Sequence, residues 1–166
     1  MSSGGAGGNR DTARPTNLEI AAALAFALGM WFALMVAGLG ISSVLFNRDV
    51  ITEPRAGVGL GPAMFFASLI AFALTLAVGA TRRRRTHRTN VSYANPALLA
   101  TVIAYLAFVV VAAAGWLLFV PGVPADAVDF ALSCALDWPA IVLALVSFVD
   151  ALAFFAYLSW RTRNVA

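Results

Sequence analysis

Four long apolar segments, separated by short polar stretches, dominate the chain. They cover residues 19–42, 60–80, 97–120 and 138–160. A helix of about 20 apolar residues spans the hydrocarbon of a bilayer, and it satisfies its backbone hydrogen bonds internally, as lipid requires. The pattern therefore predicts an all-α integral membrane protein whose transmembrane domain, residues 18–160, is a four-helix bundle.

The two ends of the chain lack such apolar runs. Residues 1–17 are rich in Gly and Ser and offer little that a core could bury, which predicts a disordered tail. The apolar run that follows is longer than the core of a signal peptide, about 7–15 residues, so we expect it to remain as a span. Residues 161–166 form a short polar end after the fourth span.

The connection before the fourth span has a helical pattern of its own. After Pro124, polar residues recur at intervals of three and four: Asp126, Asp129, Ser133 and Asp137. This spacing predicts a short amphipathic helix at the outer membrane surface, with Pro124 in its first turn. Pro139 has no backbone N–H, which favours a break near Asp137 over one bent helix from Ala125 to Trp160.

Composition supports a membrane environment. Apolar residues make up 61% of the 166 residues and charged residues only 11%, against about 45–50% and about 25% in soluble domains. Such a small number of charges cannot cover a water-facing surface. The lipid bilayer is therefore the expected partner. The net charge of +3 then reflects basic loops that set the membrane topology, and it does not indicate nucleic-acid binding.

The arginines predict the orientation in a plasma membrane. Nine of the eleven lie in the two ends and in the second connection, and only Arg48 and Arg55 lie on the opposite side. By the positive-inside rule, both termini are expected in the cytoplasm. The second connection holds the densest run, which also suits contact with anionic lipid headgroups: Arg82, Arg83, Arg84, Arg85 and Arg88.

Tryptophans fit these boundaries. Trp116, Trp138 and Trp160 fall near the ends of spans, where indole rings favour the headgroup region. Trp31 falls near the middle of the first span, so we expect it to pack against another helix.

Asp150 is the acidic residue at the centre of a span. It lies twelve residues after Trp138 and ten before Trp160, close to the bilayer midplane. A carboxylate at that depth costs about 2.5–3.5 kcal/mol on insertion scales, so Asp150 should face the bundle or another subunit. Desolvation there favours the neutral acid over the carboxylate.

Hydroxyl groups are the candidate partners of Asp150. Ser147 and Tyr157 share its helical face, and two more lie at similar depth on other spans: Ser68 and Tyr105. Two interpretations are open: a carboxylate that handles protons or cations, or a neutral hydrogen bond between helices, worth about 0.6–2 kcal/mol.

Two further patterns are candidate contact surfaces. Small residues recur every four positions along the first span: Ala21, Ala25, Gly29, Ala33 and Ala37. Such a stripe lets helix backbones approach closely, either inside the bundle or between copies of the chain. The acidic residues of the third connection, Asp126, Asp129 and Asp137, form a candidate outer acidic face.

The residues needed for catalysis in a membrane are missing from the spans. The one histidine, His87, lies outside them, and Cys134 is the one cysteine. A haem would need histidine ligands in the spans, and an intramembrane protease would need a second catalytic group beside Asp150. We therefore expect no enzyme, cofactor or metal site.

Three functions remain. The first is an accessory or assembly subunit that packs against a larger membrane complex or against itself. The second is a small proton- or cation-coupled transporter or channel subunit that uses Asp150. The third is an envelope sensor or binding protein that uses the acidic outer segment. In composition and hydropathy the chain resembles small four-helix membrane proteins common in actinobacteria, although no motif carries that resemblance.

Overall fold

The computed structural model of the chain describes residues 16–46, 59–85, 93–120 and 123–164. These residues form helices and no strand: α1 (Asn17–Phe46), α2 (Leu60–Arg85), α3 (Ala94–Phe119), α4 (Pro124–Leu136) and α5 (Trp138–Asn164). Within the described ranges, all but α4 are long and apolar enough to cross a membrane. The predicted all-α membrane bundle, with a short helix before the fourth span, is confirmed. Most of the predicted tail, residues 1–17, lies outside the described residues.

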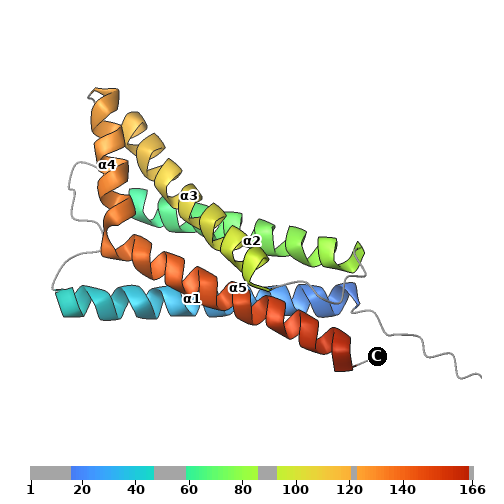
Figure 1. Cartoon of the computed structure of the whole chain (residues 1–166). Helices are drawn as coiled ribbons and strands as arrows, with labels where there is room; N and C mark the ends of the chain where they lie inside the picture. The colour runs from blue at the N-terminus through green and yellow to red at the C-terminus, as the bar shows by residue number, and fades with distance from the viewer. Residues whose placement is uncertain (1–15, 47–58, 86–92, 121–122, 165–166) are drawn as a thin grey trace, which may run out of the picture.

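The central helix of the bundle is α3. It packs against α2, α4 and α5, whereas α1 lies mainly beside α5 and has a smaller contact with α2 (Figure 1). The pairing of α1 with α5 is antiparallel, because Gly38 meets Val142 at one end and Glu19 meets Arg161 at the other. The first and last helices of the chain thus form one side of the molecule.

Local sequence signals explain where α1 and α5 begin. Thr16 and Glu19 form a capping box: the Thr16 hydroxyl accepts from the Glu19 N–H at 3.2 Å, and the Glu19 carboxylate accepts from the Thr16 N–H at 2.9 Å. Asp137 is extended (φ −82°, ψ 160°), and its carboxylate accepts from the Trp138 N–H at 2.8 Å. The predicted break therefore lies at Asp137, and Pro139 occupies the first turn of α5, where its missing N–H costs little.

Buried side chains on α2 and α3 follow rows with a four-residue spacing. The α2 row is Leu60, Met64, Ser68, Phe72, Leu76 and Ala80, and the α3 row is Ala100, Ala104, Phe108, Ala112 and Trp116. Interdigitating rows of this spacing bring helices together obliquely, and α3 runs obliquely across its neighbours (Figure 1). Small side chains allow close approach, since a Cβ added at Gly115 would collide with the Leu60 side chain.

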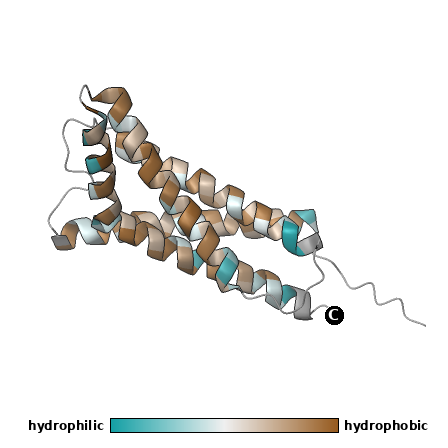
Figure 2. Ribbon diagram, turned by 45° about the horizontal axis from the view of Figure 1, so that its top comes forward, coloured by the Kyte–Doolittle hydropathy of each residue, from teal (hydrophilic) through white to brown (hydrophobic). Residues whose placement is uncertain are grey.

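Three distinct faces run along α4. Ala127 and Ala131 are buried against the bundle. A second, apolar row is exposed: Val128, Leu132 and Leu136. The third face is polar. Hydrophilic residues gather on α4 and at the ends of α2 and α5 that lie away from α4 (Figure 2). A buried side, an exposed apolar side and an exposed polar side together are the arrangement expected of a helix that lies in the membrane surface.

Two aromatic side chains of α3 attach α4. The Trp116 ring stacks on Phe130 with 4.5 Å between centroids, and the Tyr105 hydroxyl donates to the carbonyl oxygen of Ala135 at 2.8 Å. The position of Trp116 at the depth of the headgroups stays a prediction, but its ring is only 9% exposed. The reason is that α4 folds back over this end of α3 and covers the ring.

Candidate functional site

The carboxyl group of Asp150 is buried near the middle of α5. The residue is only 6% exposed, and its Oδ2 atom has no hydrogen-bond partner among the described residues. Buried polar atoms in folded proteins are nearly always paired, so each exception calls for an explanation. The Trp116 indole N–H is the other buried side-chain group without a partner among the described residues, and Asp150 is the one of the two that can carry a charge.

A hydrogen bond between α1 and α5 lies one turn from Asp150. The Trp31 indole N–H donates to the Ser147 hydroxyl at 2.8 Å, and the Trp31 ring stacks on Phe72 of α2 with 5.9 Å between centroids. Trp31 thus packs between helices, in line with its position at mid-span. Sequence reasoning did not identify its N–H as the donor to Ser147, because nothing in the sequence aligns α1 with α5.

Other buried hydroxyl groups donate hydrogen bonds to carbonyl oxygens of their own helices. Ser68 donates to the Met64 carbonyl oxygen at 2.9 Å, and Thr101 of α3 donates to the Ala97 carbonyl oxygen at 3.0 Å. These bonds use each hydroxyl hydrogen and leave the oxygen lone pairs as acceptors. Ser68 is therefore buried, as a partner of Asp150 would have to be, but its hydrogen is committed elsewhere. Thr101 is a buried hydroxyl that sequence reasoning missed.

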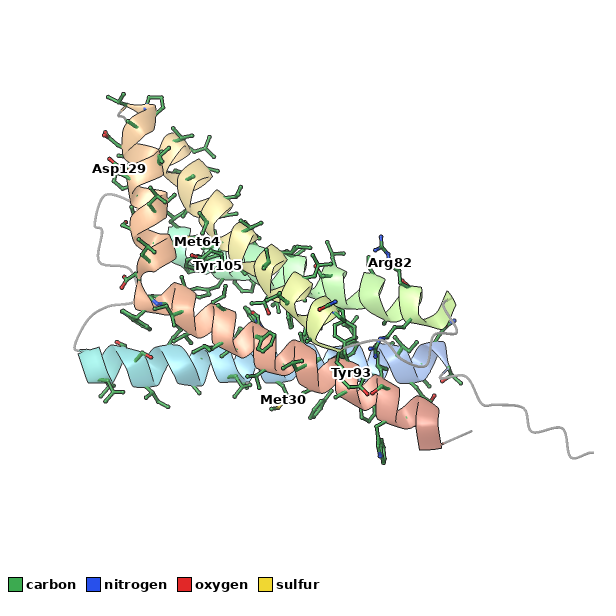
Figure 3. All side chains as sticks on the ribbon, in the orientation of Figure 1. Met30, Met64, Arg82, Tyr93, Tyr105 and Asp129 are labelled. Atoms are coloured by element: carbon green, nitrogen blue, oxygen red, sulfur yellow. The ribbon has the colours of Figure 1, made fainter. Side chains whose placement is uncertain are left out.

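The two tyrosines predicted near Asp150 are not part of this group. Tyr105 bonds to α4, as described above, and it lies where α3 approaches the α4 side of the bundle (Figure 3). Tyr157 is 49% exposed, and its ring lies beside Trp160. A residue seven positions from Asp150 is turned by about 20° on a straight helix. That drift places Tyr157 beyond the edge of the buried face.

Arg83 ties the end of α2 to α5. Its Nη1 donates to the carbonyl oxygen of Phe155 at 3.0 Å, and its guanidinium carbon lies 5.4 Å from the ring centroids of both Tyr93 and Phe155. Arg83 is thus integrated into the packing. Arg82 is exposed and points away from the bundle (Figure 3). The side chains of Arg84 and Arg85, and all of Arg88, lie outside the described residues, so the predicted lipid contact stays a prediction.

We expect Arg83→Gln to lower the free energy of unfolding by about 1–2 kcal/mol, because it removes a charge-assisted hydrogen bond and two cation–π contacts. Arg161→Gln is the comparison: Arg161 pairs with Glu19 at 3.0 Å on an exposed surface, where ion pairs contribute little. The measurement is the midpoint of thermal unfolding in detergent. Equal effects of the two substitutions would contradict the role assigned to Arg83.

The acidic residues of α4 face outward. Asp126 and Asp129 are exposed, and Asp129 points away from the bundle (Figure 3). Asp137, also exposed, caps α5 instead of belonging to a shared site. Arg48 and Arg55, the two arginines predicted on this side of the membrane, lie outside the described residues. In the described part of the chain, no three His, Cys, Asp or Glu side chains come together in a way that could hold a metal ion.

The small-residue stripe of α1 does not pack inside the bundle. All five members are exposed: Ala21, Ala25, Gly29, Ala33 and Ala37. A Cβ added at Gly29 would have no atom of the chain within 4 Å. The interpretation of this stripe as an intramolecular contact is wrong, because α1 turns Ala27, Trp31 and Met35 inward instead. Small residues that pack within the chain are found elsewhere, and α3 carries the longest series of them: Ala97, Ala100, Ala104, Ala112 and Gly115.

The comparisons with known proteins identify one family. A sequence family described as "Family of unknown function (DUF6121)" matches residues 14–166. No curated protein and no solved structure matches the chain. The matched region includes all the helices described above, so the chain belongs to the DUF6121 family.

Proposed function

We propose that this protein is a non-catalytic accessory subunit of a membrane complex, and that it docks through the exposed small-residue face of α1. The observation that carries the proposal is the direction of this stripe. It includes Gly29, around which the chain leaves open space, and it lies on the side of α1 opposite the buried Trp31. The partner we infer is a transmembrane helix of a larger membrane protein.

The physical basis is helix packing in lipid. Lipid chains are as apolar as leucine, so helices associate there through close packing, and small residues allow the closest approach. α1 is attached to its own chain along one side only, through Ala27, Trp31 and Met35. Its opposite side, centred on Gly29 and Ala33, is exposed along its length, and the exposed Phe26 and Val36 stand beside these small residues, so a partner helix would pack on the small residues between them.

The proposed orientation follows from charge. The end of the bundle that carries Arg82, Arg83 and Arg161 faces the cytoplasm, as do both termini, because basic loops are retained on that side. α4 then lies in the outer leaflet of the plasma membrane, with Leu132 and its apolar neighbours in lipid and Asp129 in water.

The test is affinity purification from native membranes of the wild type and of the double variant Gly29→Leu/Ala33→Leu. Both sites are exposed, so we expect the variant to fold normally but to retain about tenfold less of a stoichiometric partner, a loss of about 1.4 kcal/mol. The matched control is Ala114→Leu/Ala153→Leu, which adds bulk at exposed alanines of α3 and α5.

Quantitative mass spectrometry of the retained proteins distinguishes the outcomes. Equal retention of the partner by both double variants would contradict docking through α1. Recovery of the wild-type chain only with further copies of itself would show that the occupant of this face is a second copy, and the accessory function would then fail.

A further inference from the structure

We propose that Asp150 is a proton-binding site inside the bundle, at which a carboxyl group takes up and releases a proton while the fold stays intact. This goes beyond the accessory function, which requires no polar group at this depth. The step is a simple one: a proton adds to a carboxylate oxygen of Asp150 to give the neutral acid, and it leaves again as H⁺.

The first support is the unsatisfied oxygen. Asp150 is more than nine-tenths buried, and its Oδ2 has no partner among the described residues. A carboxyl whose only role is to join helices would donate to or accept from a neighbouring helix. Because no such bond to Oδ2 is present in the described bundle, a static hydrogen bond between helices does not account for this residue.

The second support is the absence of a neutralising charge near the middle of the described spans. The charged residues on the helices packed around α5 lie at the helix ends: Glu19 on α1, Arg82, Arg83, Arg84 and Arg85 on α2, and Asp126, Asp129 and Asp137 on and after α4. Arg83 reaches α5 five residues from Asp150, where its guanidinium donates to the Phe155 carbonyl oxygen. On α5 itself, Arg161 pairs with Glu19. Three other side chains on these helices or at their ends can titrate. Tyr93 lies near Arg83, and the Tyr105 hydroxyl is bonded to Ala135. Cys134 belongs to α4. A carboxylate in such surroundings gains most by binding a small cation, and a proton requires the fewest ligands.

The third support is that the nearby hydroxyl can serve both protonation states. Ser147 precedes Asp150 by three residues and so shares its face of α5, at about 5–6 Å between Cβ atoms. The Trp31 N–H occupies an acceptor position of the Ser147 oxygen. The hydroxyl hydrogen remains for a carboxylate, and a second lone pair remains for a protonated acid. A water molecule between the two side chains would fit the same pattern.

The test uses the purified full-length protein in lipid nanodiscs and a hydrophobic carbodiimide, which enters lipid and reacts with protonated carboxyl groups. We expect one stable adduct, located by mass spectrometry at Asp150. Above the midpoint of titration, its rate of formation should fall about tenfold per pH unit, because only the protonated fraction reacts. Asp150→Asn should abolish the adduct, whereas Asp129→Asn, at an exposed acid, should leave it unchanged.

A second measurement tests the proposal even if the carbodiimide cannot reach Asp150. Infrared spectroscopy should show the C=O stretching band of a protonated carboxylic acid, and this band should be lost in Asp150→Asn while circular dichroism shows the helices intact. Absence of both the adduct and the band would overturn the proposal. Suppression of labelling by sodium chloride, but not by choline chloride at the same ionic strength, would also overturn it, because the site would then bind sodium. None of these readouts depends on the partner of α1, so failure here leaves the accessory function untouched.

Discussion

Trp31→Ala is expected to lower the free energy of unfolding by about 3 kcal/mol, near the low end of the range for truncating a buried Trp. The side chain is 2% exposed, stacks on Phe72 and donates to Ser147, so its removal leaves a cavity where α1, α2 and α5 meet. Lipid rather than water surrounds the separated helices, so the transfer term is smaller than in a soluble protein and packing supplies most of the loss. The measurement is unfolding by sodium dodecyl sulphate titration, followed by circular dichroism.

Two controls separate packing from the hydrogen bond. Phe32 is 52% exposed on the same helix, so Phe32→Ala removes a large side chain without a cavity and should have almost no effect. Trp31→Phe keeps an aromatic ring against Phe72 but loses the donor to Ser147, and it should cost about 1 kcal/mol. If Phe32→Ala destabilised the protein as much as Trp31→Ala, the assigned inward face of α1 would be wrong.

Ala112→Leu is expected to lower the free energy of unfolding by about 2–3 kcal/mol, because overpacking a tight interface forces backbones apart. Ala112 is fully buried on the row through which α3 meets its neighbours, one turn from Gly115. Ala114 lies on the same helix but is exposed, so Ala114→Leu makes the identical chemical change toward lipid. The same unfolding titration measures both variants.

The contrast between the two alanines tests the central position of α3. If Ala112→Leu unfolded at the same midpoint of the titration as the wild type, α3 would not pack closely against α2. A large loss for Ala114→Leu would mean that the face of α3 pointing away from the core is not in lipid. Either result would contradict the arrangement in Figure 1.

The helices could be predicted from the sequence, because each span is long, apolar and bounded by polar residues or a proline. The short α4 was also predictable, since its acidic residues repeat at helical spacing. The ends were less certain: α1 and α2 continue to Phe46 and Arg85, past the predicted ends at residues 42 and 80. Polar residues such as Ser43 and Arg82 are compatible with further helical turns near the membrane surface, so polarity alone does not show where a helix ends.

Which side of each span faces inward could not be predicted. A span is apolar all round, so hydrophobic periodicity, which orients helices in soluble proteins, carries no information. Alanine is so frequent in α1 that a four-residue spacing arises on several faces, and the buried face proved to be that of Trp31. On α3, the packing face combines small residues with Phe108 and Trp116, so it did not stand out as a stripe.

The candidate site could be predicted only in part, because the inward side of each span could not be predicted. Asp150 stands out because it is a single acid in an apolar segment, and its burial follows from the cost of exposing it to lipid. Its neighbours depend on the relative rotation of helices. Tyr105 is turned toward α4 and Tyr157 toward the outside, and only the three-dimensional arrangement shows that Trp31 meets Ser147.

The most direct test of docking through α1 is site-specific photo-crosslinking in native membranes. A benzophenone amino acid in place of Phe26 should yield, on illumination, a defined adduct with a larger membrane protein, because Phe26 is exposed one turn from Gly29 and already carries an aromatic ring beside the small-residue face. The same amino acid at Leu106, an exposed position on α3, should yield none. No adduct from position 26, an adduct of equal yield from Leu106, or an adduct only between two copies of this chain would contradict the account.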